Sequence, residues 1–230
     1  MYEAVHARPD GSSTLARQAR TAADYGFDGI VVRSHGDAGT PDDVEAVRDA
    51  VDIDVVDGIE LRADDPAQAS GLVGNYRSKR TVVAVHGGDA RINRFAVENP
   101  AVDVLAHPMA GGGDFNHVLA NAAADNGVRI EFTLRSALRE EGGSRVHRLR
   151  DLRKLRKLVA DADAPYVVSA DPRSHLELRA QRELCALGGT IGFDAEEIRT
   201  GLTEWGRLAA RNRNRLADSF VEPGVWLDDS

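Results

Sequence analysis

The chain has 230 residues and a net charge of −8, and its length is enough for one sizeable core, so we expect a single domain spanning residues 1–230. Its one cysteine excludes an internal disulfide and a zinc site built from several cysteines. No apolar stretch approaches the roughly 20 residues that span a bilayer, which predicts a cytoplasmic protein without a membrane partner.

Short runs rich in Val, Ile and Leu alternate with helical stretches, a pattern typical of buried parallel strands joined by helices. In chain order, we expect strands at residues 2–6, 29–33, 55–61, 81–85, 102–106, 128–132, 166–169 and, most weakly, 190–192. The helices are predicted from Ser12 or Ser13 to Gly26, from Thr40 and Pro41 onward, and at residues 91–98, 115–126, 145–159 and 207–215. Eight short strands alternating with helices predict an α/β barrel of the TIM-like (β/α) class.

Three of these strands end on residues that could carry chemistry. The runs VVAVHGG, VDVLAHP and VRIEF place His86, His107 and Glu131 at or next to their last positions. In α/β barrels, side chains at the carboxyl ends of the strands converge on one face, where ligands bind. The sequence therefore predicts that these three side chains face a common site.

The same part of the chain resembles a known family. The stretches HGGDARINRFAVENPAVDVLAHP and LANAAADNGVRIEF look like the core of the archaeal ribonuclease P protein component 3 family. Upstream, YGFDGIVVRSH and VVDGIEL fit the early strands of that family, and downstream LRDLRKLRKLVADADAPYVVSADPRSHLELRAQRELCALGGTIG fits its last third. The resemblance covers nearly the whole chain, and the combination is far more specific than any single piece.

This resemblance implies an accessory subunit of a hydrolase, the ribonucleoprotein endonuclease that removes 5′ leaders from precursor tRNA. In that family the catalytic RNA and its bound magnesium ions perform the hydrolysis, so we expect no cofactor and no catalytic residue in this chain. The implied partners are ribonuclease P RNA, precursor tRNA, the other ribonuclease P proteins and component 2, with which a heterotetramer of two copies of each would form.

The acidic composition is unusual for a protein that binds RNA. Arg outnumbers Lys by 26 to 3, and Asp outnumbers Glu by 24 to 13, which resembles proteins from salt-loving organisms. At 1 M salt the Debye length is only about 3 Å, so diffuse attraction is largely screened. We therefore expect RNA binding to depend on direct arginine contacts to phosphate.

The barrel also resembles the polymerase-and-histidinol-phosphatase (PHP) superfamily of metal-dependent phosphoesterases, which hold metals through an H-x-H pair, a Glu, further His and a final D-x-H. His6 is followed by Arg8 where the second His would stand, and Arg173 replaces the last His. A guanidinium is unfavourable where a divalent metal would sit. The resemblance implies a degenerate metal site. Its vestigial candidate ligands are Glu60, His86, His107, Glu131 and Asp171.

Arginines near the predicted strand ends are instead suited to bind phosphate groups through their N–H donors. Arg91 and Arg94 follow two glycines at the start of a helix, where free N–H groups favour anions. The alternative is that these two pair with Asp89 or Glu98 as ordinary surface charges. The full set of candidate RNA-binding residues is Arg8, Arg33, Arg62, Arg91, Arg94 and Arg135.

Three alternatives stay open from the sequence. His86 and His107 could be hydrogen-bonded histidines at the barrel mouth rather than ligands. The basic amphipathic helix at residues 145–159, which follows a flexible loop predicted at Gly142 and Gly143, could be a solvated face or a contact surface. The chain itself could be a stand-alone PHP-type phosphoesterase or nuclease, or a purely structural partner of component 2.

Overall fold

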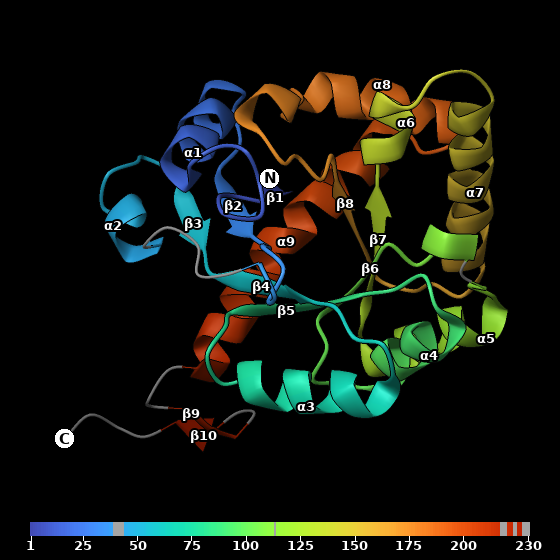
Figure 1. Cartoon of the computed structure of the whole chain (residues 1–230), viewed down its shortest axis with the longest axis horizontal. Coiled ribbons are helices and arrows are strands. Elements are labelled where there is room, and N and C mark those ends of the chain that lie inside the picture. The colour runs from blue at the N-terminus through green and yellow to red at the C-terminus, as the bar shows by residue number, and fades with distance from the viewer. Residues whose placement is uncertain (39–43, 113, 217–219, 223–224, 227–230) are drawn as a thin grey trace.

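Parallel strands form the centre of the molecule, and helices surround them (Figure 1). The computed structural model describes residues 1–38, 44–112, 114–216, 220–222 and 225–226. The central strands are β1 Tyr2–Val5, β2 Gly29–Val32, β3 Asp54–Val56, β4 Gly58–Leu61, β5 Val82–His86, β6 Val104–Ala106, β7 Arg129–Thr133 and β8 Tyr166–Ser169. They pair in parallel as a three-stranded sheet, β1-β2-β3, and a five-stranded sheet, β4-β5-β6-β7-β8. The predicted α/β barrel is confirmed.

The predicted strand at residues 55–61 is divided into β3 and β4 by Asp57 alone. β3 pairs with β2, and β4 then runs beside the segment that follows β2, through a parallel bridge between His35 and Glu60. Gly58 permits this bend, because a Cβ there would lie 2.6 Å from the carbonyl oxygen of Val32. The two sheets are therefore joined along one bent path.

β1 and β8 lie side by side on the other side of the barrel, but without a regular ladder. The Ser169 hydroxyl donates to the carboxylate of Glu3 and, at 3.2 Å, to the carbonyl oxygen of Ala4. Just beyond the strand ends, the His6 amide donates to the Pro172 carbonyl oxygen at 3.0 Å. This seam brings residues near both ends of the chain together at the carboxyl ends of the strands.

Helices follow most strands and cover the outside of the barrel. They are α1 Leu15–Asp24, α2 Val44–Arg48, α3 Pro66–Tyr76, α4 Ala90–Glu98, α5 His117–Asn126, α6 Arg135–Arg139, α7 Gly142–Asp161, α8 Gln181–Ile191 and α9 Ala195–Leu216. Two short 3₁₀ helices are η1 Ala110–Gly112 and η2 His175–Glu177, and β9 Phe220–Glu222 pairs antiparallel with β10 Val225–Trp226. None of the described helices is long and apolar enough to cross a membrane.

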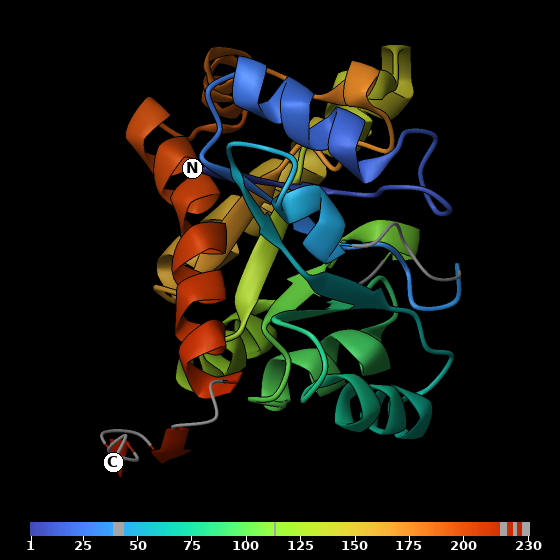
Figure 2. The same cartoon turned by 90° about the vertical axis from the view of Figure 1, so that its left-hand side faces the viewer.

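The amino ends of the strands are closed by α9, which runs along one side of the barrel (Figure 2). Trp205 is fully buried there and donates its indole N–H to the Val168 carbonyl oxygen at 2.9 Å. It packs with a group of small interior residues, Ala4, Val31, Val56, Val82, Ala84, Val104 and Val167. The apolar interior therefore lies next to α9, at the amino ends of the strands. Polar residues occupy the opposite end of the barrel, at the carboxyl ends of the strands.

Several predicted boundaries were wrong. Residues 190–192 do not form a strand but end α8, because Leu184, Leu187 and Ile191 lie on one buried helical face. Thr14, not Ser12 or Ser13, caps α1, since the Ser13 hydroxyl is bonded to His175.

Two further predictions concern the connecting segments. Gly142 and Gly143 open α7 instead of forming a loop. The helix start predicted at Thr40 and Pro41 lies outside the described residues.

Candidate functional site

Polar side chains fill the barrel at the carboxyl ends of its strands, directly above the apolar interior. Strand side chains alternate, so the residue two positions after an interior one again faces inward. His6 follows Ala4 in this way, and Arg33 follows Val31. We call the resulting group the strand-end cluster. It comprises His6, Asp10, Arg33, His35, Glu60, His86, His107, Glu131 and Asp171.

Arg33 lies at the centre of this cluster and is 1% exposed. Its Nε donates to Glu60 Oε2 at 2.8 Å, and its terminal nitrogens contact Glu60 and Glu131. Both carboxylates are fully buried. Burial opposes charge on Glu60 and Arg33, but the attraction of Arg33 to the two carboxylates holds the pKa of Glu60 well below its ordinary value and that of Arg33 well above.

Two stacked histidines share a single carboxylate oxygen beside Arg33. Asp10 Oδ2 lies 2.5 Å from His6 Nδ1 and 2.8 Å from His35 Nδ1, and the ring centroids are 4.7 Å apart. Burial lowers the pKa of each histidine, yet the hydrogen bonds to Asp10 outweigh it, together with Asp171 for His6 and Glu60 for His35. The net effect raises both pKa values and favours the imidazolium forms.

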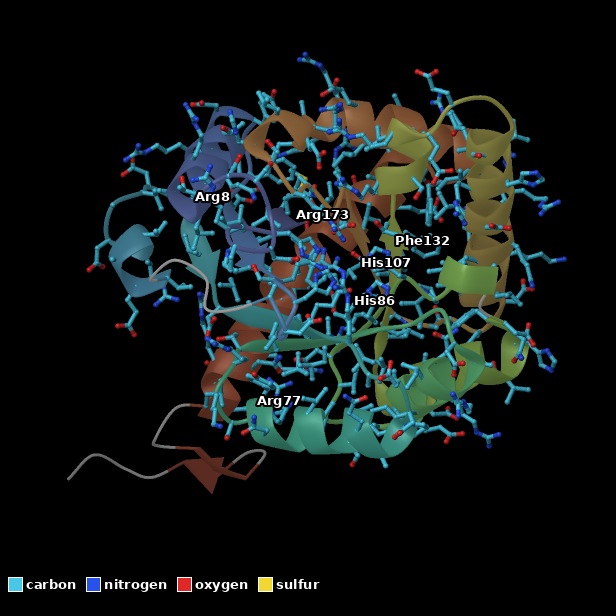
Figure 3. The ribbon with its side chains drawn as sticks, in the orientation of Figure 1. Arg8, Arg77, His86, His107, Phe132 and Arg173 are labelled. Atoms are coloured by element: carbon cyan, nitrogen blue, oxygen red, sulfur yellow. The ribbon has the colours of Figure 1, made fainter. Side chains whose placement is uncertain are left out.

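His86 and His107 complete the cluster near the barrel mouth (Figure 3). His86 Nδ1 lies 2.5 Å from Glu60 Oε1, and the His86 ring centroid is 4.6 Å from that of His107. Burial lowers the pKa of His107 and favours its neutral form. His86 is thus hydrogen-bonded at the barrel mouth, as one of the two sequence interpretations proposed.

The backbone is strained at two cluster residues. His107 and Asp171 have φ values of 50° and 49°, each directly before a proline. Such conformations cost roughly 1–3 kcal/mol each and persist where the surroundings impose them. Asp171 is held by His6, whose Nε2 lies 2.8 Å from Asp171 Oδ1, and His107 Nε2 lies 3.7 Å from Asp171 Oδ2. The strain therefore orients both side chains into the cluster.

Two groups of ligand-type side chains come close enough to be considered for a metal ion. Among the described residues, His6, Asp10 and His35 form one group and His35, Glu60 and His86 the other, with ligand atoms within 4.8 Å of one another. Metal ligation needs neutral imidazoles and available carboxylates. Here Glu60 is bound to Arg33, and Asp10 is shared by two histidines that favour protonation. The donor set therefore does not fit a divalent metal in this arrangement.

A small pocket opens beside the cluster, between the barrel mouth and α7. Its volume is about 140 Å³, below the roughly 300–1,000 Å³ of typical small-molecule sites. His107, Glu131 and Thr133 line its inner side, and Arg148 and Leu152 of α7 line its outer side. The pocket is too small to enclose a nucleotide.

The candidate RNA contacts on α4 are exposed, but carboxylates engage them. Arg91 Nε lies 3.3 Å from Asp89 Oδ1, and Arg94 Nε lies 2.8 Å from Glu98 Oε1. These are the surface pairs that the sequence left open as the alternative. Arg62 is exposed beside them, in a hollow that it shares with three carboxylates, those of Asp37, Asp64 and Asp89.

The other three candidates lie in different surroundings. Arg33 is a correction to the predicted surface set, because its guanidinium is buried between two carboxylates and cannot reach a phosphate there. Arg135 is half-buried and ion-paired with Glu177. Arg8 is exposed, with its Nε 3.3 Å from the Ser12 carbonyl oxygen, so it does not enter the strand-end cluster as the broken motif suggested. The cation that lies among the carboxylates of the cluster is Arg33.

The predicted candidate ligands all lie in the cluster, namely Glu60, His86, His107, Glu131 and Asp171. Asp10 and His35, which come from the loops after β1 and β2, were not among the predicted residues. A signal for Arg33 was present, because it stands two residues after the interior Val31 and directly after β2, a strand without charged residues. The loop residues carried no such periodic signal.

A family model and curated relatives match nearly the whole chain, and they agree on one family. The family model described as RNase P subunit p30 matches residues 1–217. Ribonuclease P protein component 3 of Haloarcula marismortui is 64% identical, with 100% of this chain and 97% of the relative covered. The protein of the same name from Natronomonas pharaonis is 61% identical, with 99% and 95% covered.

Solved structures show the same fold. A chain in the cryo-EM structure of archaeal ribonuclease P with mature tRNA superposes with a TM-score of 0.86 at 22% identity, covering 100% of this chain and 99% of that one. Histidinol phosphate phosphatase from Lactococcus lactis gives a TM-score of 0.59 at 11% identity, covering 84% and 94%. The fold is thus shared with a phosphatase, whereas the high identities lie with one family. This chain belongs to the RNase P subunit p30 family, as a relative of the archaeal ribonuclease P protein component 3 proteins.

Proposed function

We propose that this chain is a protein subunit of ribonuclease P that supports a catalytic RNA and has no catalytic centre of its own. Membership of the family and identity above 60% to two component 3 proteins support the assignment to ribonuclease P. The enzyme it serves is the endoribonuclease that removes 5′ leaders from precursor tRNA. The protein would act by binding RNA and other subunits.

One observation carries the non-catalytic role: Arg33 fills the centre of the strand-end cluster. Metal-dependent hydrolysis needs a divalent ion that polarises phosphate or lowers the pKa of bound water. At this position a guanidinium forms ion pairs with Glu60 and Glu131 instead. A buried group of this kind, with all its charges paired, stabilises the loops at the barrel mouth rather than activating water.

The partners follow from the same assignment. They are ribonuclease P RNA, precursor tRNA, component 2 in a heterotetramer, and the other protein subunits. Magnesium would be held by the RNA and not by this chain. As a tRNA-processing subunit, the chain would work in the cytoplasm.

Reconstituted cleavage of precursor tRNA tests this proposal. The cognate RNA and the other protein subunits are assayed in magnesium with and without this chain, and the chain is also assayed alone. We expect the complete mixture to cleave faster than the mixture that lacks the chain, and the chain alone to be inactive. An equal rate with and without the chain would contradict the subunit role.

The main rival function is that of a stand-alone metal-dependent phosphoesterase, and the fold shared with the phosphatase is the reason to consider it. The same assay separates the two. If the chain is treated with EDTA and returned to magnesium buffer, we expect it to stimulate cleavage as well as untreated chain. Cleavage by the chain alone that His86→Ala abolishes would establish a working metal centre and exclude our proposal.

A further inference from the structure

Five arginines lie in two segments, one from the first third of the chain and one from the last, that meet outside the barrel mouth. We call this surface the arginine face. It comprises Arg8, Arg17, Arg20, Arg173 and Arg179. Arg17 and Arg20 belong to α1, Arg8 precedes that helix, and the other two flank η2. Arg8 and Arg173 are labelled in Figure 3, above the histidines of the strand-end cluster.

Hydrogen bonds hold the two segments together. The Ser12 amide donates to the Arg173 carbonyl oxygen at 2.7 Å, and Arg8 Nε donates to the Ser12 carbonyl oxygen at 3.3 Å. Ser13 Oγ lies 2.8 Å from His175 Nδ1. The fold therefore joins the segment that carries Arg8, Arg17 and Arg20 to the segment around η2 that carries the other two arginines.

Arg17 and Arg20 present their side chains to one surface hollow together with His175. Thr14 and Thr21 complete the polar part of its lining. Both arginines are exposed. Three residues apart on α1, they lie on one side of the helix and can reach the same ligand.

The five guanidiniums have no carboxylate partner among the described residues. Arg8 and Arg179 donate only to backbone carbonyl oxygens, and Arg17, Arg20 and Arg173 make no side-chain hydrogen bond within the described part of the chain. By contrast, fifteen of the 26 arginines pair with a described carboxylate. In a chain with net charge −8, unpaired arginines gathered in one place form a distinct surface.

Two carboxylates within the same two segments are committed elsewhere, and a third, Asp24 at the end of α1, forms no ion pair with a described arginine. Asp10 binds His6 and His35 in the strand-end cluster. Glu177 binds Arg135 and its carboxylate also accepts the Arg173 backbone amide at 2.8 Å. None of these three carboxylates forms an ion pair with an arginine of the arginine face, so the guanidiniums remain available to a partner.

We propose that the arginine face binds the phosphodiester backbone of RNA. Guanidinium groups with free N–H donors match phosphate in a bidentate geometry, and direct contacts of this kind persist at salt concentrations that screen diffuse attraction. Leu176 lies in η2 beside these arginines and is 75% exposed, which suits apolar contact with ribose or a base. The inference rests on the proposed function and locates its RNA surface on α1 and η2 rather than on α4.

The test compares two matched double variants of the full chain. Arg17→Gln with Arg20→Gln removes two charges from the arginine face, and Arg91→Gln with Arg94→Gln removes two from α4. Gln keeps the helix propensity and most of the side-chain length. Each is assembled with the other subunits and titrated, over a salt series, against labelled cognate ribonuclease P RNA and, separately, against labelled precursor tRNA.

We expect the arginine-face variant to bind at least one of the two RNAs about tenfold more weakly, with a salt slope smaller by about 1 for each lost phosphate contact. The α4 variant should bind like the wild type. The RNA that responds identifies the source of the phosphates.

Unchanged affinity and salt slope in the arginine-face variant would overturn the inference. So would unchanged RNA affinity with loss of a protein subunit from the assembly, because the face would then dock a protein. A circular dichroism melt at the wild-type temperature confirms that the variant is folded. If the wild-type chain does not stimulate cleavage, the proposed function fails; if it does and the arginine-face variant matches it in binding, only this inference fails.

Discussion

The strand-end cluster and the arginine face are neighbours that share two segments of the chain, yet positive charge is paired in the first and unpaired in the second. His6 and Asp171 face into the barrel, where every charged group has an ionic partner. Arg8 and Arg173, two residues further along in each segment, lie outside the cluster, and neither is paired with a described carboxylate. β1 ends at Val5 and β8 at Ser169, so the alternation of the strands does not continue to Arg8 and Arg173, and the chain turns from the paired interior to the surface within two residues.

The difference shows that the partner of an arginine, more than its position near a strand end, indicates its role. Arg33 is held by two buried carboxylates and belongs to the framework of the barrel mouth. Arg91 and Arg94 are exposed but already paired with carboxylates. Only arginines that are both accessible and unpaired keep their full capacity to bind phosphate.

The largest expected effect is on stability and comes from Arg33→Ala. Removing one member of a buried ionic group leaves the charges of Glu60 and Glu131 uncompensated, which typically costs about 3–5 kcal/mol. Urea denaturation should therefore show a free energy of unfolding lower by about that amount, against about 0.5 kcal/mol or less for the exposed Arg17→Ala. A small loss in both variants would mean that Arg33 does not hold the cluster together.

The second expected effect is a loss of stability as pH rises. The pKa values of His6 and His35 are raised in the folded state by their carboxylate partners, so their stabilisation is complete below pH about 6.5 and is lost as pH rises through the folded pKa. Burial raises the pKa of Glu3 to about 7, so folding also weakens as pH rises from about 4.5 to about 7.

Chemical denaturation at pH 5, 7 and 9 measures this trend. We expect the free energy of unfolding to fall across the series, and His6→Gln with His35→Gln to flatten its upper part. Arg17→Gln with Arg20→Gln serves as the control and should keep the wild-type slope, because no titrating partner holds those arginines. A flat wild-type profile between pH 7 and 9 would show that the two histidines are neutral throughout.

The smallest expected effect is that of Arg94→Ala on α4. It removes an exposed pair with Glu98 four residues later, which is worth about 0.3–0.5 kcal/mol. High salt should shrink the difference in thermal unfolding between variant and wild type. A loss above 1 kcal/mol that persists in high salt would mean that Arg94 has a structural role that its surface pair does not explain.

Much of the fold could be predicted because its strands are short apolar runs with clear boundaries. Seven of the eight predicted strand ranges contain observed strands, and Asn126 with Gly127 ends α5 as expected, the glycine having φ 64°. The failure at residues 190–192 arose because Thr, Ile and glycine suit both a strand and a helix end. Packing of Ile191 against the rest of α8 decided between the two.

The sequence by itself determined the barrel and the strand-end residues His86, His107 and Glu131, because apolar runs and their ends are local properties. The resemblance to the PHP superfamily added Glu60 and Asp171 to the candidate ligands. Only the tertiary structure decided which arginine side chain lies among the candidate ligands. Arg8 and Arg33 both follow interior positions, but Arg33 is buried between two carboxylates while Arg8 lies on the surface. Pairing of charges across strands depends on distances between residues remote in sequence, which no local pattern records.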